Sequence, residues 1–320
     1  MKRLLVPAIG LGIFVIMGSS CSLKQFAFRS MANVIAPLPY ARKQHLQPQG
    51  AIIALTGEDD IQLVTDVFPA IVKTYEMLYL SDPQHRGLAL MSGSLYIMYA
   101  NAFVQTPADY IHETQFEKKN AEYIRAKKFY IRGALSVVQS LGTAYPFFYE
   151  MIDYSSEAKI RELLGQCVPA DVESLYWAGS GFLGAFALDP LDSNSLQRVP
   201  AAVAMLERAA ELDPQFNEGA IWEVLAAFYA AAPETLGGGA EKALYAYNKA
   251  LELSKGERPS VYVLYAQSFC IPQQDSEGFD EALQKALAIN PDDYPGNKFA
   301  ITISQQKARW LLQNKPDYFL

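Results

Sequence analysis

The glycine pattern Gly179-Ser180-Gly181-Phe182-Leu183-Gly184 is the segment of this chain that looks most like a chemical signature. Its spacing matches the fingerprint with which dinucleotide-binding proteins hold a pyrophosphate at a helix N-terminus. That chemistry needs a strand before the motif and a helix after it, and the surrounding sequence shows no β-α-β alternation. We therefore interpret the glycines as small residues for close helix packing, and we predict no bound nucleotide or other cofactor.

The other chemical signatures are incomplete. His112-Glu113 begins like a zinc-protease helix, but Phe116 stands where the second histidine would be, so we predict no metal site. The run Gly237-Gly238-Gly239 lacks the Lys-Ser/Thr ending of a phosphate loop and is interpreted as a link between helices. No serine or cysteine has a histidine near it in sequence, and no carboxylate pair stands out from solvated faces. We predict no catalytic residue and no enzyme; a hydrolase hidden in a helical fold is the alternative.

The first residues resemble a targeting signal. Lys2 and Arg3 precede 20 uncharged, mostly apolar positions that end in small residues around Cys21. This resembles the bacterial lipobox, in which lipid is added to the cysteine and the chain is cut before it, although Gly18 stands where leucine is usual. We expect a lipoprotein signal peptide over residues 1–20 and a lipid on Cys21. Plain secretion or an uncleaved membrane anchor is the alternative.

A lipid on Cys21 would attach the protein to a membrane and place it in the periplasm. Ser22 follows the cysteine where an aspartate would favour retention at the inner membrane, so the outer membrane is the expected location. Cys167 and Cys270 remain after processing, and they either pair in an oxidising compartment or stay as buried thiols.

Composition limits the class of protein. The chain has 320 residues, of which 51% are hydrophobic and 19% are charged, so it can bury a large core. Its net charge of -7 leaves no positive surface of the kind that nucleic acid requires, and we predict no nucleic-acid partner.

Apolar residues recur three and four positions apart after residue 50, which predicts helices throughout. Breaks are expected at Thr106-Pro107 and Val199-Pro200 among other Pro and Gly sites, and a long helix is expected over residues 109–141. Residues 21–50 contain three prolines and are interpreted as a tether, and residues 51–320 as a single helical domain.

An internal repeat is present in the second half of the chain. Three helix ends share the spacing of small and bulky residues that resembles the second helix of a tetratricopeptide repeat: Ala202, Leu206 and Ala209; Ala243, Tyr247 and Ala250; and Phe279, Leu283 and Ala286. Alanine lets two helices approach closely and the bulky residue fills the groove between them. The predicted fold is all-α, an irregular tetratricopeptide-like solenoid of helical hairpins.

Several segments together resemble the TatT-like T components of TRAP transporters, a family of periplasmic lipoproteins. They are the lipobox-like Cys21, Tyr176-Trp177-Ala178-Gly179-Ser180, Thr235-Leu236-Gly237-Gly238-Gly239, Asn290-Pro291-Asp292-Asp293 and Lys307-Ala308-Arg309-Trp310-Leu311-Leu312. The resemblance implies association with a TRAP solute-binding protein, the P component, and a homotrimer.

Aromatic residues make up 12% of the chain and are the strongest sign of a binding surface. First helices of tetratricopeptide arrays line the concave face, where aromatic rings can hold an apolar or amphipathic ligand or a partner segment. The predicted groove residues are Trp177, Phe182, Trp222, Phe228, Tyr229 and Tyr262. The alternative for each ring is simple core filling.

The function that the sequence favours is a lipid-anchored periplasmic scaffold for a TRAP solute-binding protein, which assists transport of a hydrophobic small molecule. The alternative is a structural or assembly lipoprotein of the outer membrane without a transport role.

Overall fold

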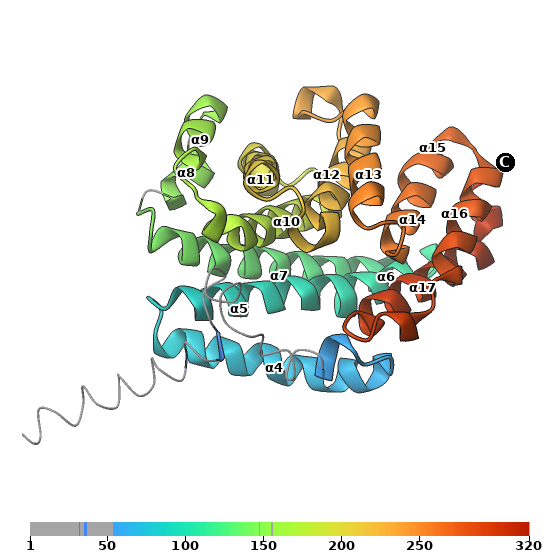
Figure 1. Ribbon diagram of the computed structural model, residues 1–320, viewed down its shortest axis with the longest axis horizontal. Helices are drawn as coiled ribbons and strands as arrows, with labels where there is room; N and C mark the ends of the chain where they lie inside the picture. The colour runs from blue at the N-terminus through green and yellow to red at the C-terminus, as the bar shows by residue number, and fades with distance from the viewer. Residues whose placement is uncertain (1–31, 33–34, 37–53, 147, 155, 320) are drawn as a thin grey trace, which may run out of the picture.

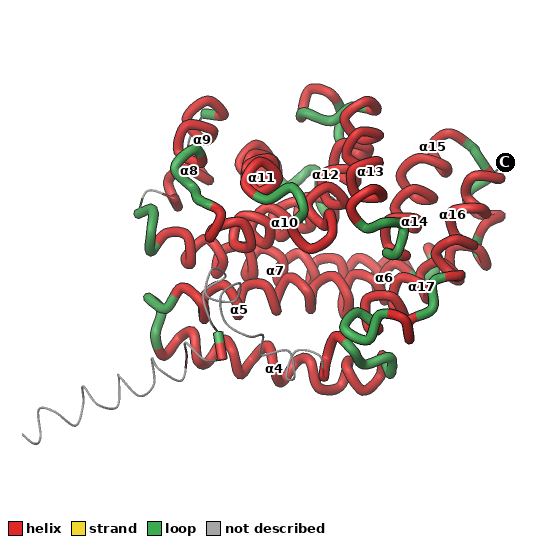
Figure 2. Tube along the Cα trace, in the orientation of Figure 1, coloured by secondary structure: helices red, strands yellow, loops and turns green. Residues whose placement is uncertain are grey.

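The computed structural model describes residues 32, 35–36, 54–146, 148–154 and 156–319. The expected signal peptide, Cys21 and nearly all of the expected tether lie outside the described residues. Within the described part, every regular element is a helix and there is no strand (Figure 2), so the all-α prediction is confirmed.

The helices have the following bounds in chain order. They are α4 (Ile61–Ser81), α5 (Arg86–Met98), α6 (Thr106–Asp109), α7 (Phe116–Gly142), α8 (Phe148–Tyr154), α9 (Glu157–Leu164), α10 (Val172–Leu188), α11 (Ser193–Leu212), α12 (Ala220–Ala231), α13 (Ala240–Leu253), α14 (Pro259–Tyr265), α15 (Ile271–Gln273), α16 (Ser276–Ala288) and α17 (Lys298–Gln313). Two π-helical segments, η1 (Tyr99–Gln105) and η6 (Ala266–Cys270), join α5 to α6 and α14 to α15 without a break.

The break expected at Thr106-Pro107 is absent, and the π segment η1 lies in its place. The helix runs on through Pro107, because the backbone widens just before the proline and the Thr106 N–H bonds to the Asn101 carbonyl, five residues back. Widening accommodates a ring that cannot donate a hydrogen bond and would clash inside a regular helix. The η6 segment precedes Pro272 in the same way.

Two other expected boundaries were wrong. The helix α11 continues through Pro200, where a break was expected, and its neighbours Ala201 and Ala202 are fully buried. Packing on both sides therefore offsets the one lost backbone hydrogen bond. The long helix expected from residue 109 begins at Phe116 instead, because His112 accepts from the Thr114 N–H and starts a 3-10 turn there.

Helices α4, α5 and α7 lie side by side, and α10 crosses on the far side of α7 (Figure 1). The helix Arg86–Asp109 is long and apolar enough to cross a membrane, but most of its apolar length is buried among these neighbours, as in the core helix of a globular protein. Its contact with α7 is close because glycines meet: a β-carbon on Gly93 would lie 2.5 Å from the Gly133 carbonyl oxygen.

The second half of the chain forms three successive helical hairpins. They are α10 with α11, α12 with α13, and the α14–α15 helix with α16. The repeat residues Ala209, Ala250 and Ala286 are at most 1% exposed at these contacts. The likeness of the array to tetratricopeptide repeats remains an interpretation of its spacing.

The last helix, α17, packs against α14 and α16 and also reaches the first helices of the chain. Phe299 stacks on Phe103 with ring centroids 5.6 Å apart, and Lys307 Nζ lies 3.3 Å from Asp109 Oδ2. The array therefore curves so that its last helix, α17, lies beside α6 (Figure 1).

Candidate functional site

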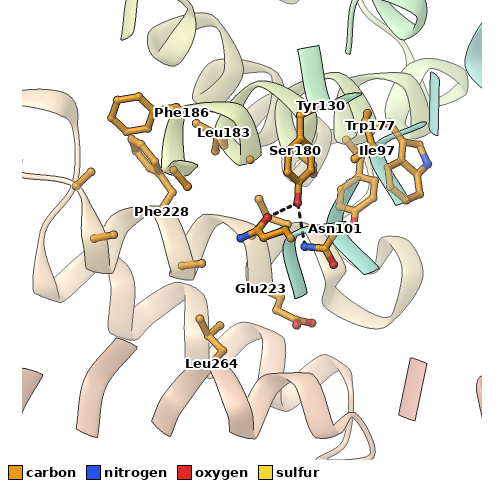
Figure 3. A pocket seen from close by; sticks show the side chains of 18 of the residues that line it. Ile97, Asn101, Tyr130, Trp177, Ser180, Leu183, Phe186, Glu223, Phe228 and Leu264 are labelled. Atoms are coloured by element: carbon orange, nitrogen blue, oxygen red, sulfur yellow. Dashed lines mark hydrogen bonds between the residues drawn. The ribbon is translucent and has the colours of Figure 1, made fainter. Parts of the chain in front are cut away.

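A cavity of about 790 Å³ lies inside the curve of the array. Its walls come from the α5–α6 helix, α7, α10 and α12, with Leu264 of α14 below them (Figure 3). A volume of this size is typical of a site for a small molecule or cofactor. The first helices of the hairpins thus face the cavity, and the second helices α11 and α13 contribute no lining residue.

Apolar and aromatic side chains make up most of the wall. Leu183 and Phe186 project from α10, and Phe228 projects from α12 on the same side (Figure 3). Trp177 lies at the other side, edge-on to Tyr176 with ring centroids 5.0 Å apart. Such a wall favours an apolar ligand, because binding removes apolar surface from water.

The glycines of α10 bring its neighbours close to the cavity. A β-carbon on Gly181 would lie 2.8 Å from Ile97 Cδ1, and one on Gly184 would lie 2.7 Å from the Tyr130 ring. A β-carbon on Gly179 would meet Leu206 of α11 at 2.7 Å. The dinucleotide-like spacing therefore serves close contact between helices, as the sequence analysis preferred.

A polar cluster interrupts the apolar wall. The Tyr130 hydroxyl accepts a hydrogen bond from Asn101 Nδ2 at 3.0 Å and donates one to Gln105 Oε1 at 2.6 Å (Figure 3). Burial raises the pKa of Tyr130 well above its ordinary value, so its hydroxyl stays protonated. Asn101 and Gln105 both belong to the π segment η1, which sets their direction toward α7.

Within the described part of the chain, Glu223 is the one charged residue in the cavity wall. Its carboxylate lies 3.6 Å from Arg258 Nη2, and Arg258 also donates to the Asn217 carbonyl at 2.6 Å. Burial raises the pKa of the neighbouring Tyr176 to about 12. Of the residues that the structure describes, no lysine, arginine or histidine lines this cavity.

The six predicted groove residues do not lie together. Trp177 and Phe228 line the cavity, but Phe182 is 2% exposed and lies against Arg198, away from it. Tyr229 is also buried and donates to Glu207 Oε1 at 2.9 Å.

Trp222 and Tyr262 point elsewhere as well. The Trp222 indole N–H donates to the Pro214 carbonyl at 2.9 Å and its ring packs edge-on to Tyr245. Tyr262 packs against the separate core of α14, α16 and α17. A residue one turn away from a lining residue lines the cavity only if its side chain also points into it. The sequence spacing places residues along a helix but could not resolve where each of these side chains points.

Sequence reasoning missed Asn101, Gln105, Tyr130 and Glu223. The available signal was the presence of amides in the otherwise apolar stretch after Arg86, with an expected proline break that concealed their place in a continuous helix. Among the described residues no group of His, Cys, Asp and Glu side chains could hold a metal ion. Cys167 and Cys270 are free, buried thiols in separate hydrophobic clusters.

The described residues form an all-helical array with a mostly apolar cavity on its inner side. The family model of the TRAP transporter T-component matches residues 57–319, and the chain belongs to this family. A protein of Treponema pallidum (strain Nichols), described as an uncharacterized protein, is 47% identical over 303 residues, which is 94% of either chain. Members of this family are transport components that associate with other components of TRAP transporters.

Proposed function

We propose that the protein is the periplasmic helical partner of a TRAP solute-binding protein and that its cavity holds a hydrophobic solute during transfer. The observation that carries this proposal is the cavity of about 790 Å³, formed by the inner helices of the array and lined mostly by apolar side chains. Membership of the T-component family supports the link to a TRAP transporter.

The partner part of the proposal is tested by copurification. The full chain is isolated from its native membranes, and the proteins that elute with it are identified by mass spectrometry. The proposal expects a TRAP solute-binding protein among them, in an amount that a salt wash does not abolish. Recovery of outer-membrane assembly proteins in its place would favour the structural or assembly role.

The location is tested at Cys21. We propose a lipid on this residue, which lies outside the described residues, and anchoring at the periplasmic face of the outer membrane. Cys21→Ala should release the protein from membranes or leave an unprocessed precursor. An unchanged mature mass and an unchanged membrane fraction would reject lipidation at Cys21.

We further propose the homotrimer that the family resemblance implies. Helix α4 presents four large apolar side chains that are 42–64% exposed and that a subunit contact would cover: Leu63, Val67, Met77 and Leu80. Native mass spectrometry of the mature protein gives the subunit number directly. A monomer at micromolar concentration would reject this part of the proposal.

A further inference from the structure

We infer that the cavity selects an amphiphile with an uncharged, hydrogen-bonding head group and rejects the corresponding carboxylate. This inference rests on the proposed ligand-binding function. It depends on three features of the wall as the described residues form it: a pair of side-chain amides, one carboxylate that is already paired, and the absence of any cationic lining residue.

The amides supply the recognition of the head group. Within the described part of the chain, Asn101 Oδ1 and Gln105 Nε2 make no hydrogen bond, although their partner atoms hold the Tyr130 hydroxyl. One amide oxygen therefore remains to accept, and one amide nitrogen remains to donate. A hydroxyl or an ester carbonyl with a neighbouring hydroxyl can use both.

The arrangement of the wall fits an amphiphile. Asn101 and the Tyr130 hydroxyl lie on one side of the cavity, and Phe186, Leu183 and Phe228 lie on the other (Figure 3). An alkyl chain can pack against the three apolar side chains while its head group meets the amides. An entirely apolar ligand would leave the amides without partners, which costs free energy.

Glu223 disfavours a carboxylate head group. Its side chain is 20% exposed, so its charge is only partly screened by water. A carboxylate ligand in the same cavity would lose its hydration without gaining a cation, because the positive charge of Arg258 is already paired with Glu223. Arg258 does not line the cavity and is already engaged by Glu223 and the Asn217 carbonyl. The same ion pair neutralises the charge of Glu223, so a cationic ligand meets no unpaired carboxylate in the cavity.

The test uses displacement of N-phenyl-1-naphthylamine, an uncharged fluorescent probe, by three ligands with the same tail. These are decanol, decanoate and decylamine, titrated into the full mature chain at neutral pH. We expect decanol to displace the probe at a concentration about tenfold lower than either charged ligand, a difference that corresponds to about 1.4 kcal/mol. Equal or stronger displacement by decanoate or decylamine would overturn the inference.

Two variants locate the effect. Glu223→Gln removes the partner of Arg258 and leaves its positive charge free, so decanoate should displace the probe at a concentration about tenfold lower than in the wild type, and its disadvantage relative to decanol should shrink. Asn101→Leu should raise the concentration of decanol that is needed to displace the probe, once the variant's own affinity for the probe has been measured. The control is Glu252→Gln, whose carboxylate is 66% exposed on α13 and pairs with Lys249. If decanoate displaces the probe at the same concentration in Glu223→Gln as in Glu252→Gln, the inference is wrong.

Failure of this inference differs from failure of the proposed function. Absence of probe binding in the wild type and in every variant would contradict the proposal that the cavity binds a ligand. Binding of the probe without selection among head groups would remove only the selectivity argued here. Copurification of a solute-binding protein is measured separately and depends on neither outcome.

Discussion

Tyr130 shows at the scale of the residue how a polar group is kept inside an apolar cavity. Its ring is 3% exposed and packs over Gly184 of α10, where any larger residue would collide with it. Its hydroxyl is satisfied by two amides from one π segment. A buried hydroxyl without such partners would destabilise the fold, so the two amides stabilise the protein itself.

Individual site residues could be predicted only in part. Trp177 and Phe228 were predicted because they are large rings on first helices, and both line the cavity. Trp222 carries the same signal, but its indole caps the turn before its own helix through the Pro214 carbonyl. Composition cannot distinguish these two uses of an aromatic ring, since both bury apolar surface and differ only in direction.

A pH dependence is expected from Asp192, the N-cap of α11. Its carboxylate accepts from the Ser195 N–H and hydroxyl and lies 3.1 Å from Lys127 Nζ of α7. These contacts, led by the Ser195 hydroxyl, lower the pKa of Asp192 to about 2. The pKa of an aspartate in the unfolded chain is about 3.9. The charged carboxylate of Asp192 therefore stabilises the folded state fully above that pH. The stabilisation is then lost as pH falls toward about 2.

The expected result is that Asp192→Asn lowers the Tm near neutral pH, and that the gap from the wild type narrows between about pH 4 and about pH 2. Thermal unfolding followed by circular dichroism at a series of pH values measures it. Glu241→Gln, at an exposed carboxylate on α13, is the control. A gap that stays constant over this range would show that Asp192 acts only as a neutral hydrogen-bond acceptor.

At the scale of the element, helices could be predicted from apolar spacing but their interruptions could not. Proline was read as a stop at Thr106-Pro107 and Val199-Pro200, and both helices continue. Local propensity disfavours proline in a helix, but burial of the flanking residues on several sides outweighs one lost hydrogen bond. The π segment that results at residues 99–105 turns Asn101 and Gln105 toward Tyr130, so the part of the site that was missed arises from this unpredicted feature.

The close crossing of α5 and α7 predicts that a larger residue at the contact destabilises the protein. Gly133→Ala should place a β-carbon 2.6 Å from the Gly93 carbonyl oxygen and 2.7 Å from Ile97 Cγ1. The two helices would have to separate, at a cost of about 1–3 kcal/mol in the free energy of unfolding. Urea denaturation measures the change.

The matched control is Gly142→Ala in the same helix, where the nearest atom would lie at an ordinary 3.4 Å. Alanine has the higher helix propensity, so this variant should be neutral or slightly stabilised. Equal free energies of unfolding in the two variants would mean that α5 and α7 do not approach as closely as described.

For the whole molecule, the helical class and the three second-half hairpins follow from sequence, but the curvature of the array does not. It depends on contacts nearly 200 residues apart in sequence, such as Lys307 with Asp109, and Phe299 with Phe103. Repeat spacing describes neighbouring helices only, because each repeat contacts the next. The cavity is a product of that curvature, which is why the sequence indicated a groove without its polar side.

The closing contact of α17 leads to a prediction about cooperativity. Phe299 packs against a cluster of α4 and α5 residues that includes Val64 and Phe68 of α4. Phe299→Ala should reduce stability by about 1–2 kcal/mol, since the ring is only partly buried. It should also speed hydrogen exchange in α4, although α4 lies more than 200 positions away in sequence. Mass spectrometry measures the exchange rate in α4. An exchange rate in α4 equal to that of the wild type would contradict the contact.

The control for this variant is Phe116→Ala, because the Phe116 ring is 65% exposed. It removes the same side chain from α7 without opening a packed cluster. Its stability and its exchange in α4 should both match those of the wild type.

Native mass spectrometry of the mature protein purified from its own membranes tests the central claim, that the cavity holds a hydrophobic small molecule, most directly. The cavity can be filled from within by Ala227→Trp, since Ala227 lines it on α12. The matched control is Ala121→Trp, at an exposed position on α7. We expect wild type and Ala121→Trp to carry a bound small molecule that Ala227→Trp lacks while remaining folded. The same bound mass in folded Ala227→Trp, or no bound mass in the wild type, would contradict the claim.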